Sequence, residues 1–265
     1  MAIRQATLGL IKTTIAAGLT FIAGYTDVVG WLSLNRVFTA QMSGNLVLLG
    51  VHVAAGDRQA WLQIDAIAAF LAGLVITGGV IEIGMRARMP RIFVVALLVE
   101  FLMLGVFTAM GGELPARTDG QIITTDWQSY VLVGVLAFAM GGQNTSLRMA
   151  GILSTFTTHM TGVLTSFSEE IIVCLFSLFQ AARRRRHGGF TTESLRARHA
   201  TAFKNIGASA MLLVGFFAGA LLGALLWQSA GLRPAMAVPL ALLCGIAAVD
   251  LVIPLTIFPQ PAKAR

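Results

Sequence analysis

The chain has 265 residues, of which 56% are apolar and only 12% are charged, and its mean hydropathy is +0.79. Soluble domains contain about 45–50% apolar and about 25% charged residues, so this composition excludes large soluble domains. The net charge of +7 would point to nucleic acid in a soluble protein. Here the basic residues lie between apolar runs, where they set membrane orientation. We therefore predict a polytopic membrane protein with no nucleic-acid partner.

Six apolar runs are long enough to cross a bilayer, which takes about 20 residues. They do not alternate as barrel strands do, so the expected fold is all-α. In chain order, the six runs lie at about 10–31, 61–84, 92–110, 127–147, 202–227 and 234–258. Two weaker runs remain. Residues 45–55 are too few to cross, and residues 163–182 begin with several polar residues, so both are expected to be short re-entrant or interfacial helices.

Basic residues predict the topology, because cytoplasmic loops collect Lys and Arg. They gather near the N-terminus, at 86–91, in the loop 181–204 and at the C-terminus, whereas the loops 111–126 and 228–233 hold few. The first apolar run has no clear cleavage site and is expected to remain as a span. We predict one domain, 1–265, in a bacterial inner (plasma) membrane, with both termini and the loop 181–204 in the cytoplasm.

The two halves of the sequence resemble each other. Gly24 matches Gly142, FTAQMSG at 38–44 matches FTTHMTG at 156–162, and FLAG at 70–73 matches FFAG at 216–219. The first two matches share an offset of 118 and the third has an offset of 146, because the second half contains the inserted basic loop. Three spans per half would place the halves in opposite orientations. We predict a 3+3 inverted repeat, as in many secondary transporters, with repeats at about 8–112 and 127–260.

Each matched motif ends in a Ser-Gly or Thr-Gly pair before an apolar run. This pattern is typical of a helix N-terminus, with Ser43 or Thr161 as the cap. If both helices are re-entrant, their N–H groups face a shared cavity that suits an anionic or strongly dipolar solute. The alternative is two interfacial turns followed by helices that lie along the membrane.

Asp27 lies inside the first apolar run, where an ionisable residue is costly and therefore a functional candidate. The alternative is a structural hydrogen bond near the outer end of the span. In the second half, His159 stands where the first half has Gln41, either as a proton relay with Asp27 or as a plain hydrogen-bonding group. The expected solute contacts are Asp27, Thr39, Gln41, Ser43, Gly44, Asn45, Asn144, His159, Thr161 and Gly162.

Three other acidic residues fall in apolar runs. Glu82 is expected to pair with Arg86, four residues later on the same helix. Glu100 and Asp250 lie deeper, where each could line the cavity or pair with a polar neighbour.

A second group of residues has packing as its expected role. Gly215, Gly219 and Gly223 form a smooth helix face that could join either protomers of a homo-oligomer or the two halves. The basic loop is expected to contact anionic lipid. Neither the cysteines nor the histidines have metal-ligand spacing, so no metal or cofactor is expected.

The segment 24–50 resembles the YoaK-type family of bacterial inner-membrane proteins, which is defined as a domain of unknown function. Its signature is G-x-x-D-A followed by F-x-x-x-M-T-G-N, with Val28 here in place of Ala and Ser43 in place of Thr. The matching residues are Gly24, Asp27, Phe38, Met42, Gly44 and Asn45. The resemblance implies a multi-spanning membrane protein and brings no substrate or reaction.

The function expected from these features is a secondary transporter or channel-like permease for a small solute, with its site between the repeats. One alternative is a membrane scaffold or assembly partner without transport activity. Another is an intramembrane enzyme that uses Ser43 or His159. The sequence disfavours an enzyme, because it has neither a G-x-S-x-G nor an H-E-x-x-H motif.

Overall fold

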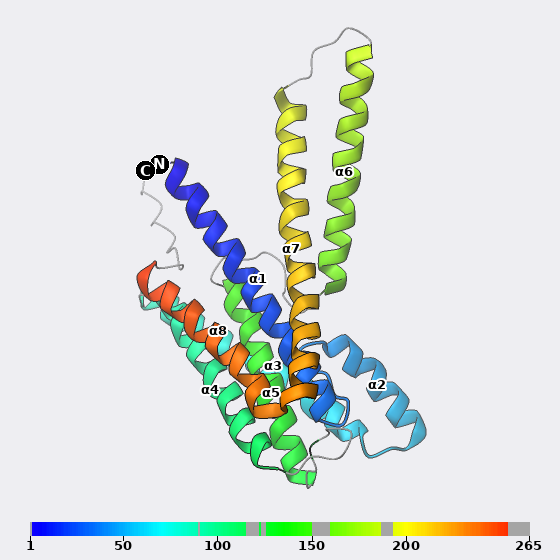
Figure 1. Cartoon of the computed structure of the whole chain (residues 1–265), viewed down its shortest axis with the longest axis vertical. Coiled ribbons are helices and arrows are strands. Elements are labelled where there is room, and N and C mark those ends of the chain that lie inside the picture. Colours follow the sequence, from blue (N-terminus) through cyan, green and yellow to red (C-terminus); the bar gives the residue numbers. More distant parts are fainter. Residues whose placement is uncertain are drawn as a thin grey trace.

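A computed structural model describes residues 2–89, 91–114, 122, 126–149, 160–186 and 193–253. Within these residues the regular elements are α-helices, as the sequence predicts (Figure 1). The helices are α1 (Ala2–Ser33), α2 (Met42–Ala55), α3 (Ala60–Arg86), α4 (Ile92–Glu113), α5 (Asp126–Met149), α6 (Met160–Arg186), α7 (Glu193–Ala230) and α8 (Leu232–Val252).

Six segments within these helices are long and apolar enough to cross a membrane. They are Gly9–Ser33, Ala60–Arg86, Ile92–Glu113, Met160–Gln180, Ala200–Ala230 and Leu232–Val252. The set differs from expectation at one point, because it contains the first part of α6 and not α5. The composition of α5 is less apolar since its last turns carry a polar run, Gln143 to Ser146, of which Gln143 and Asn144 are buried. These groups face protein rather than lipid.

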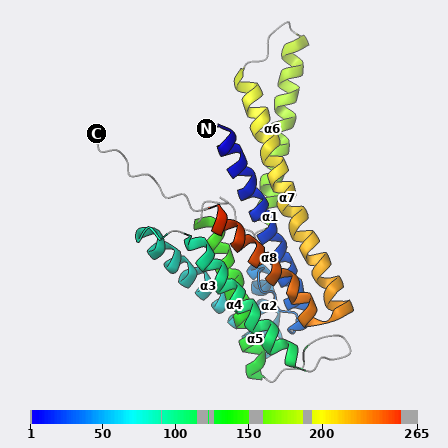
Figure 2. The same ribbon diagram turned by 60° about the vertical axis from the view of Figure 1, so that its left-hand side comes forward.

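Helices α1, α4 and α7 run in one direction along the bundle, and α3, α5 and α8 run in the other (Figures 1 and 2). The start of α1, the α3–α4 turn and the end of α8 therefore lie at one end, which we call the basic end because it carries Arg86, Arg88 and Arg91. The α7–α8 turn lies at the opposite end, where Arg233 forms an ion pair with Glu113. This relative placement agrees with the expected topology, and the side that faces the cytoplasm stays a prediction.

Two close helix crossings hold the bundle together. Where α1 crosses α7, a Cβ atom on Gly24 would overlap the carbonyl oxygen of Phe216, and one on Gly219 would overlap that of Phe21. Gly215 and Gly223 also approach carbonyl oxygens of α1. Glycine lets helix backbones approach closely in a membrane. The glycine face on α7 is therefore occupied by α1 of the same chain and is not available to a second protomer.

The crossing of α3 and α5 has the same design. A Cβ atom on Gly73 would overlap the carbonyl oxygen of Phe138, and one on Gly141 would overlap that of Phe70. Around these crossings, α1, α4 and α5 supply nearly all of the largest fully buried side chains, among them Leu19, Ile22, Leu104, Leu132 and Met140. Helices α1 and α5 also take part in the two close crossings and lie at the centre of the bundle.

The two weaker apolar runs form helices that pack on one neighbour each. Among the described helices, α2 contacts only α3, and α6 contacts only α7. Helix α6 and the first part of α7 extend beyond the other helices at the basic end (Figures 1 and 2). The outer side of α6 is an exposed apolar row, with Ile172, Leu175, Phe176 and Phe179. The first part of α6, Met160–Gln180, is long and apolar enough to cross a membrane, and its non-crossing position stays a prediction.

Candidate functional site around Asp27

The candidate site begins where the chain turns back on itself after α1. A tight turn follows Ser33, in which the Val37 N–H donates to the Leu34 carbonyl oxygen at 3.0 Å. Its central residues, Asn35 and Arg36, have φ of 44° and 58°. Positive φ at both central residues is the pattern of a type I′ turn, which reverses the chain sharply. Residues 37–41 consequently run back along α1.

Asp27 holds this returning segment in place. Its Oδ1 atom accepts hydrogen bonds from the Thr39 and Ala40 N–H groups, both at 2.8 Å, and from the Thr39 hydroxyl at 3.4 Å. The Asp27 side chain is only 3% exposed. Asp27 therefore makes the structural hydrogen bonds that were the alternative interpretation of this residue in the sequence.

The expected capping role of Ser43 is wrong. Helix α2 begins at Met42 with Gln41 as its N-cap residue, no side chain caps it, and Ser43 is exposed. The carboxylate of Asp27 binds the backbone donors that lead into α2, so an acceptor from α1 replaces the local cap. The corresponding expectation for Thr161 is also wrong, because α6 begins at Met160 and Thr161 lies inside its first turn.

Asn45 closes the loop between the returning segment and α2. Its Oδ1 accepts the Phe38 N–H at 3.0 Å, its Nδ2 donates to the Phe38 carbonyl oxygen at 2.6 Å, and its side chain is fully buried. The Phe38 ring stacks on Trp31 with ring centroids 4.3 Å apart. The same ring lies 2.8 Å from where a Cβ atom on Gly44 would be. The F-x-x-x-M-S-G-N motif is thus a single packed unit.

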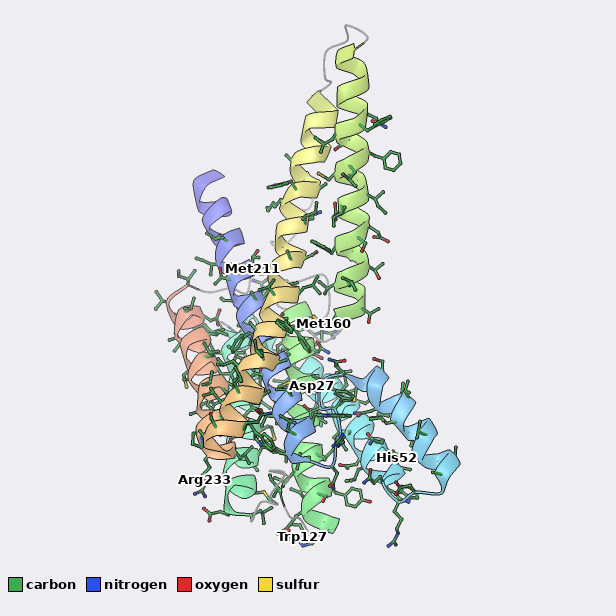
Figure 3. All side chains as sticks on the ribbon, turned by 45° about the vertical axis from the view of Figure 1, so that its right-hand side comes forward. Asp27, His52, Trp127, Met160, Met211 and Arg233 are labelled. Atoms are coloured by element: carbon green, nitrogen blue, oxygen red, sulfur yellow. The ribbon has the colours of Figure 1, made fainter. Side chains whose placement is uncertain are left out.

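A cavity of about 230 Å³ lies beside this unit, where α1 meets α7. Figure 3 shows Asp27 within the bundle at this level. The lining residues come from α1, from the returning segment and from α7, and they are Gly24, Asp27, Val28, Trp31, Phe38, Gln41, Phe216 and Ala220. The polar side-chain groups among these lining residues are the carboxylate of Asp27, the amide of Gln41 and the indole N–H of Trp31.

The structure assembles the first-half motif but does not bring the second-half residues to the same cavity. Asn144 is buried on α5, whereas Thr161 and Gly162 are exposed on the first turn of α6. None of the three lines the cavity of Asp27. His159 lies outside the described residues.

A second buried polar pair lies deeper in the bundle. Glu100 on α4 is 2% exposed, and its Oε1 accepts a hydrogen bond from Gln143 Nε2 on α5 at 2.9 Å. Gln143 also donates to the Leu19 carbonyl oxygen of α1 at 3.2 Å. Of the two alternatives expected for Glu100, the structure therefore shows pairing with a polar neighbour. Asp250 is likewise buried, on α8.

Gln143 and Asp65 are not among the residues expected from the sequence. Gln143 is the residue that joins Glu100 to α1, and it lies within the run of polar residues that ends α5. Asp65 is half-buried on α3, and its carboxylate lies 3.5 Å from the Cβ position of Gly134 on α5. The rule that selected Asp27, an acid inside an apolar run, also applies to Asp65 and would have found it.

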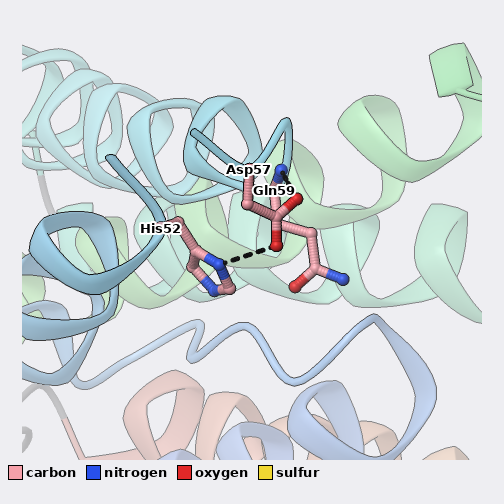
Figure 4. Close-up of polar contacts among 3 residues, drawn as sticks. All are labelled: His52, Asp57 and Gln59. Atoms are coloured by element: carbon pink, nitrogen blue, oxygen red, sulfur yellow. Dashed lines mark hydrogen bonds and ion pairs between the residues drawn. The ribbon is translucent and has the colours of Figure 1, made fainter. Parts of the chain in front are cut away.

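The α2–α3 connection lies outside the spans and has its own polar cluster (Figure 4). Asp57 accepts the Gln59 N–H at 3.0 Å and lies 3.1 Å from the ring Nδ1 of His52. These contacts, first of all the Gln59 N–H, hold the pKa of Asp57 below its usual value. At the other end of the bundle, Glu82 pairs with Arg86 at 2.8 Å, as predicted. Within the described residues no three His, Cys, Asp or Glu side chains form a group that could hold a metal ion.

Long apolar helices around a buried polar interior define a multi-pass α-helical membrane protein. The chain belongs to the family described as "Protein of unknown function (DUF1275)", whose model matches residues 15–249. This match confirms the resemblance found in the segment 24–50.

Two relatives of the chain are both described as UPF0700 transmembrane proteins. The chain is 29% identical over 174 residues to the UPF0700 transmembrane protein YoaK of Bacillus subtilis (strain 168). The aligned region covers 64% of this chain and 72% of that protein. It is 27% identical over 168 residues to the UPF0700 transmembrane protein RA0705 of Rhizobium meliloti (strain 1021). This aligned region covers 63% of this chain and 64% of that protein. No solved structure matches the chain significantly.

Proposed function

We propose that this chain is a secondary transporter or permease for a small solute and that the cavity at Asp27 is part of the solute path. The observation that carries the proposal is the position of Asp27, a buried carboxyl group within a membrane span that lines a cavity. Charged groups at membrane depth are costly and typically mark paths for solutes or ions.

The half-length helix beside the cavity supports the same proposal. Helix α2 has 14 residues, about 21 Å at 1.5 Å per residue, which is too short for the roughly 30 Å of a bilayer core. Because the returning segment is bound to Asp27, the start of α2 lies close to the level of Asp27. Asp27 is six residues, or about 9 Å, before the end of α1. This arrangement favours a re-entrant helix over an interfacial one, and irregular backbone at membrane depth occurs where it lines a cavity or is buried in protein.

The proposal includes a 3+3 inverted repeat. Its support is that both close crossings use the same pairs of residue types. Phe70 and Gly73 correspond to Phe216 and Gly219 at the expected offset of 146, and these residues occupy equivalent places in the two crossings. Phe21 and Gly24 correspond to Phe138 and Gly141 at an offset of 117, one less than expected. Helices that would correspond run in opposite directions (Figure 1), and such repeats carry sites at their interface.

The test is proton-coupled uptake in proteoliposomes that contain the purified protein and a trapped pH-sensitive dye. Solutes are added from outside one class at a time, and the internal pH is followed. Asp27→Asn keeps an acceptor for the Thr39 and Ala40 N–H groups but removes the charge and the exchangeable proton. We expect solute-dependent proton movement with the wild-type protein, loss of it with Asp27→Asn, and no change with Glu82→Gln, whose carboxylate is distant and exposed.

Two outcomes contradict the proposal. If no solute class moves protons or accumulates in the vesicles, the chain is not a transporter of this kind. If a solute is transported equally well by wild-type protein and Asp27→Asn, the cavity is not its path. Circular dichroism and the unfolding temperature of each variant in detergent show whether a loss of uptake comes from misfolding.

The second candidate function is a membrane scaffold, and one observation favours it. Every hydrogen bond described for the Asp27 side chain joins it to the neighbouring turn of the same chain, as expected for a residue that only maintains the fold. In that case Asp27→Asn changes the unfolding temperature, and neither the wild-type protein nor the variant moves any solute.

A further inference from the structure

The charge that the Asp27 cavity presents to a solute can be worked out from its walls. The backbone N–H groups of Thr39 and Ala40 point at Asp27 Oδ1 and are therefore used within the protein. These are the donors that an anionic solute would need if it bound where the chain enters α2. Asp27 itself takes the place of such an anion.

The remaining wall residues offer only neutral side-chain donors, the amide N–H groups of Gln41 and the indole N–H of Trp31. The cavity lining, all of it in the described part of the chain, includes no basic side chain. Gln41 provides the amide, and Phe216, Ala220, Val28 and Gly24 are apolar. An anion in this cavity would face the carboxylate of Asp27 at low dielectric, where repulsion between like charges is strong.

A cation meets the opposite conditions. It would be attracted to the carboxylate of Asp27, and Trp31 and Phe38, whose rings stack on each other, line the same cavity. Aromatic faces attract ammonium groups, and tryptophan does so most strongly. The apolar remainder of the wall favours a solute with an apolar body next to its charged group.

We infer that the cavity between α1, the returning segment and α7 binds a small organic cation, an amine with an apolar body. This inference rests on the proposed transport function and names its substrate class, in place of the anionic solute that the sequence favoured. The cavity volume of about 230 Å³ is below the roughly 300–1,000 Å³ of pockets for drug-sized ligands, so the amine is smaller than these.

The experiment compares two probes that share an aromatic ring and differ in charge, benzylammonium and benzoate. The unfolding temperature of the purified protein in detergent is measured against the concentration of each probe, because a ligand that binds only the folded state stabilises it. Asp27→Asn removes the charge and Trp31→Leu removes the aromatic face. Their matched controls are Glu82→Gln and Trp127→Leu, at an exposed carboxylate and an exposed tryptophan away from the cavity.

We expect benzylammonium to raise the unfolding temperature of the wild-type protein and of both controls, with no effect of benzoate. Asp27→Asn is expected to weaken the apparent affinity about tenfold or more, since a close charge partner is lost. Trp31→Leu is expected to weaken it by a smaller factor. The starting unfolding temperature of each variant shows whether it folds.

The other outcomes separate this inference from the proposed function. Stabilisation by benzoate, or equal effects of benzylammonium on the wild-type protein and Asp27→Asn, overturns the cation site while leaving transport of another solute in place. No stabilisation by either probe, together with uptake of a different solute that depends on Asp27, also overturns it. Binding of benzylammonium that depends on Asp27, without transport of any solute, supports the site and contradicts the transport function.

Discussion

Asn45 binds the backbone of Phe38 through both ends of its amide, in a place without access to water. Asn45→Ala would leave a buried N–H and a buried carbonyl group without partners, and each such group costs about 1–3 kcal/mol. For the two groups together we expect the free energy of unfolding to fall by about 2–6 kcal/mol. Thermal unfolding in detergent measures the change.

Ser43 provides the matched control for this prediction. It lies two residues away on the same helical turn and is exposed, so Ser43→Ala should change stability by no more than about 0.5 kcal/mol. Equal losses in the two variants would contradict the role assigned to Asn45.

Asp57 gives the α2–α3 connection a dependence on pH. Because the Gln59 N–H holds the pKa of Asp57 below its usual value, its contribution to stability is present above the unfolded pKa of about 3.9 and is lost as the pH falls through the folded pKa. The amide resonance of Gln59 should shift in an NMR titration with a midpoint below about pH 3.9. Asp57→Asn keeps an acceptor and should remove the shift.

At the residue scale, the sequence singled out Asp27 and Asn45 but not the groups to which they are joined. Asp27 and Asn45 were selected because they are polar within apolar surroundings. Their partners depend on the turn at Asn35 and Arg36, which has neither glycine nor proline to mark it. Local capping rules pointed to Ser43, because such rules compare near neighbours and Asp27 lies twelve residues before Thr39.

The crossings of α1 with α7 and of α3 with α5 depend on glycines that lie against backbone atoms. Gly24→Ala would press a methyl group into the Phe216 carbonyl, and a helix must move to accept it. We expect a loss of about 1–3 kcal/mol, the range for overpacking in a well-packed core. Gly141→Ala should have a similar effect in the other crossing, as measured by the unfolding midpoint.

Gly9 separates the packing effect from helix propensity. It lies on α1 with no atom within 4 Å of its Cβ position, so Gly9→Ala should leave stability unchanged or raise it by up to about 1 kcal/mol. A loss in Gly9→Ala equal to that in Gly24→Ala would show that the close approach to α7 is not the cause.

At the element scale, the lengths of the apolar runs predicted the number and approximate bounds of the helices well. Hydropathy alone did not show that α5 is central in the bundle whereas α6 packs on a single neighbour. Helix α5 is central because its polar residues meet partners on other helices, as Gln143 meets Glu100. A sequence window records the composition of a helix and not what lies beside it.

The alternating helix directions predict opposite accessibility for the two ends of the bundle. With Cys174 and Cys244 replaced by serine, Arg88→Cys and Glu113→Cys can be labelled in intact cells by a membrane-impermeant thiol reagent. We expect Glu113→Cys to react from outside and Arg88→Cys to react only after the membrane is permeabilised. Labelling of both positions from outside would contradict the topology, and the reverse pattern would overturn the cytoplasmic position of the basic end.

The central position of α5 has a consequence for how the protein enters the membrane during synthesis. Its last turns carry polar groups that are costly in lipid. Two of them, Gln143 and Thr145, have hydrogen-bond partners on α1, α3 and α4, which precede α5 in the chain. If α5 left the insertion machinery without partner helices, it would partition poorly into the bilayer. We therefore expect α5 to enter the bilayer by packing against α3 and α4, which have already formed a hairpin. Weakening the contact at Gly73 would then lower the yield of inserted protein as well as its stability.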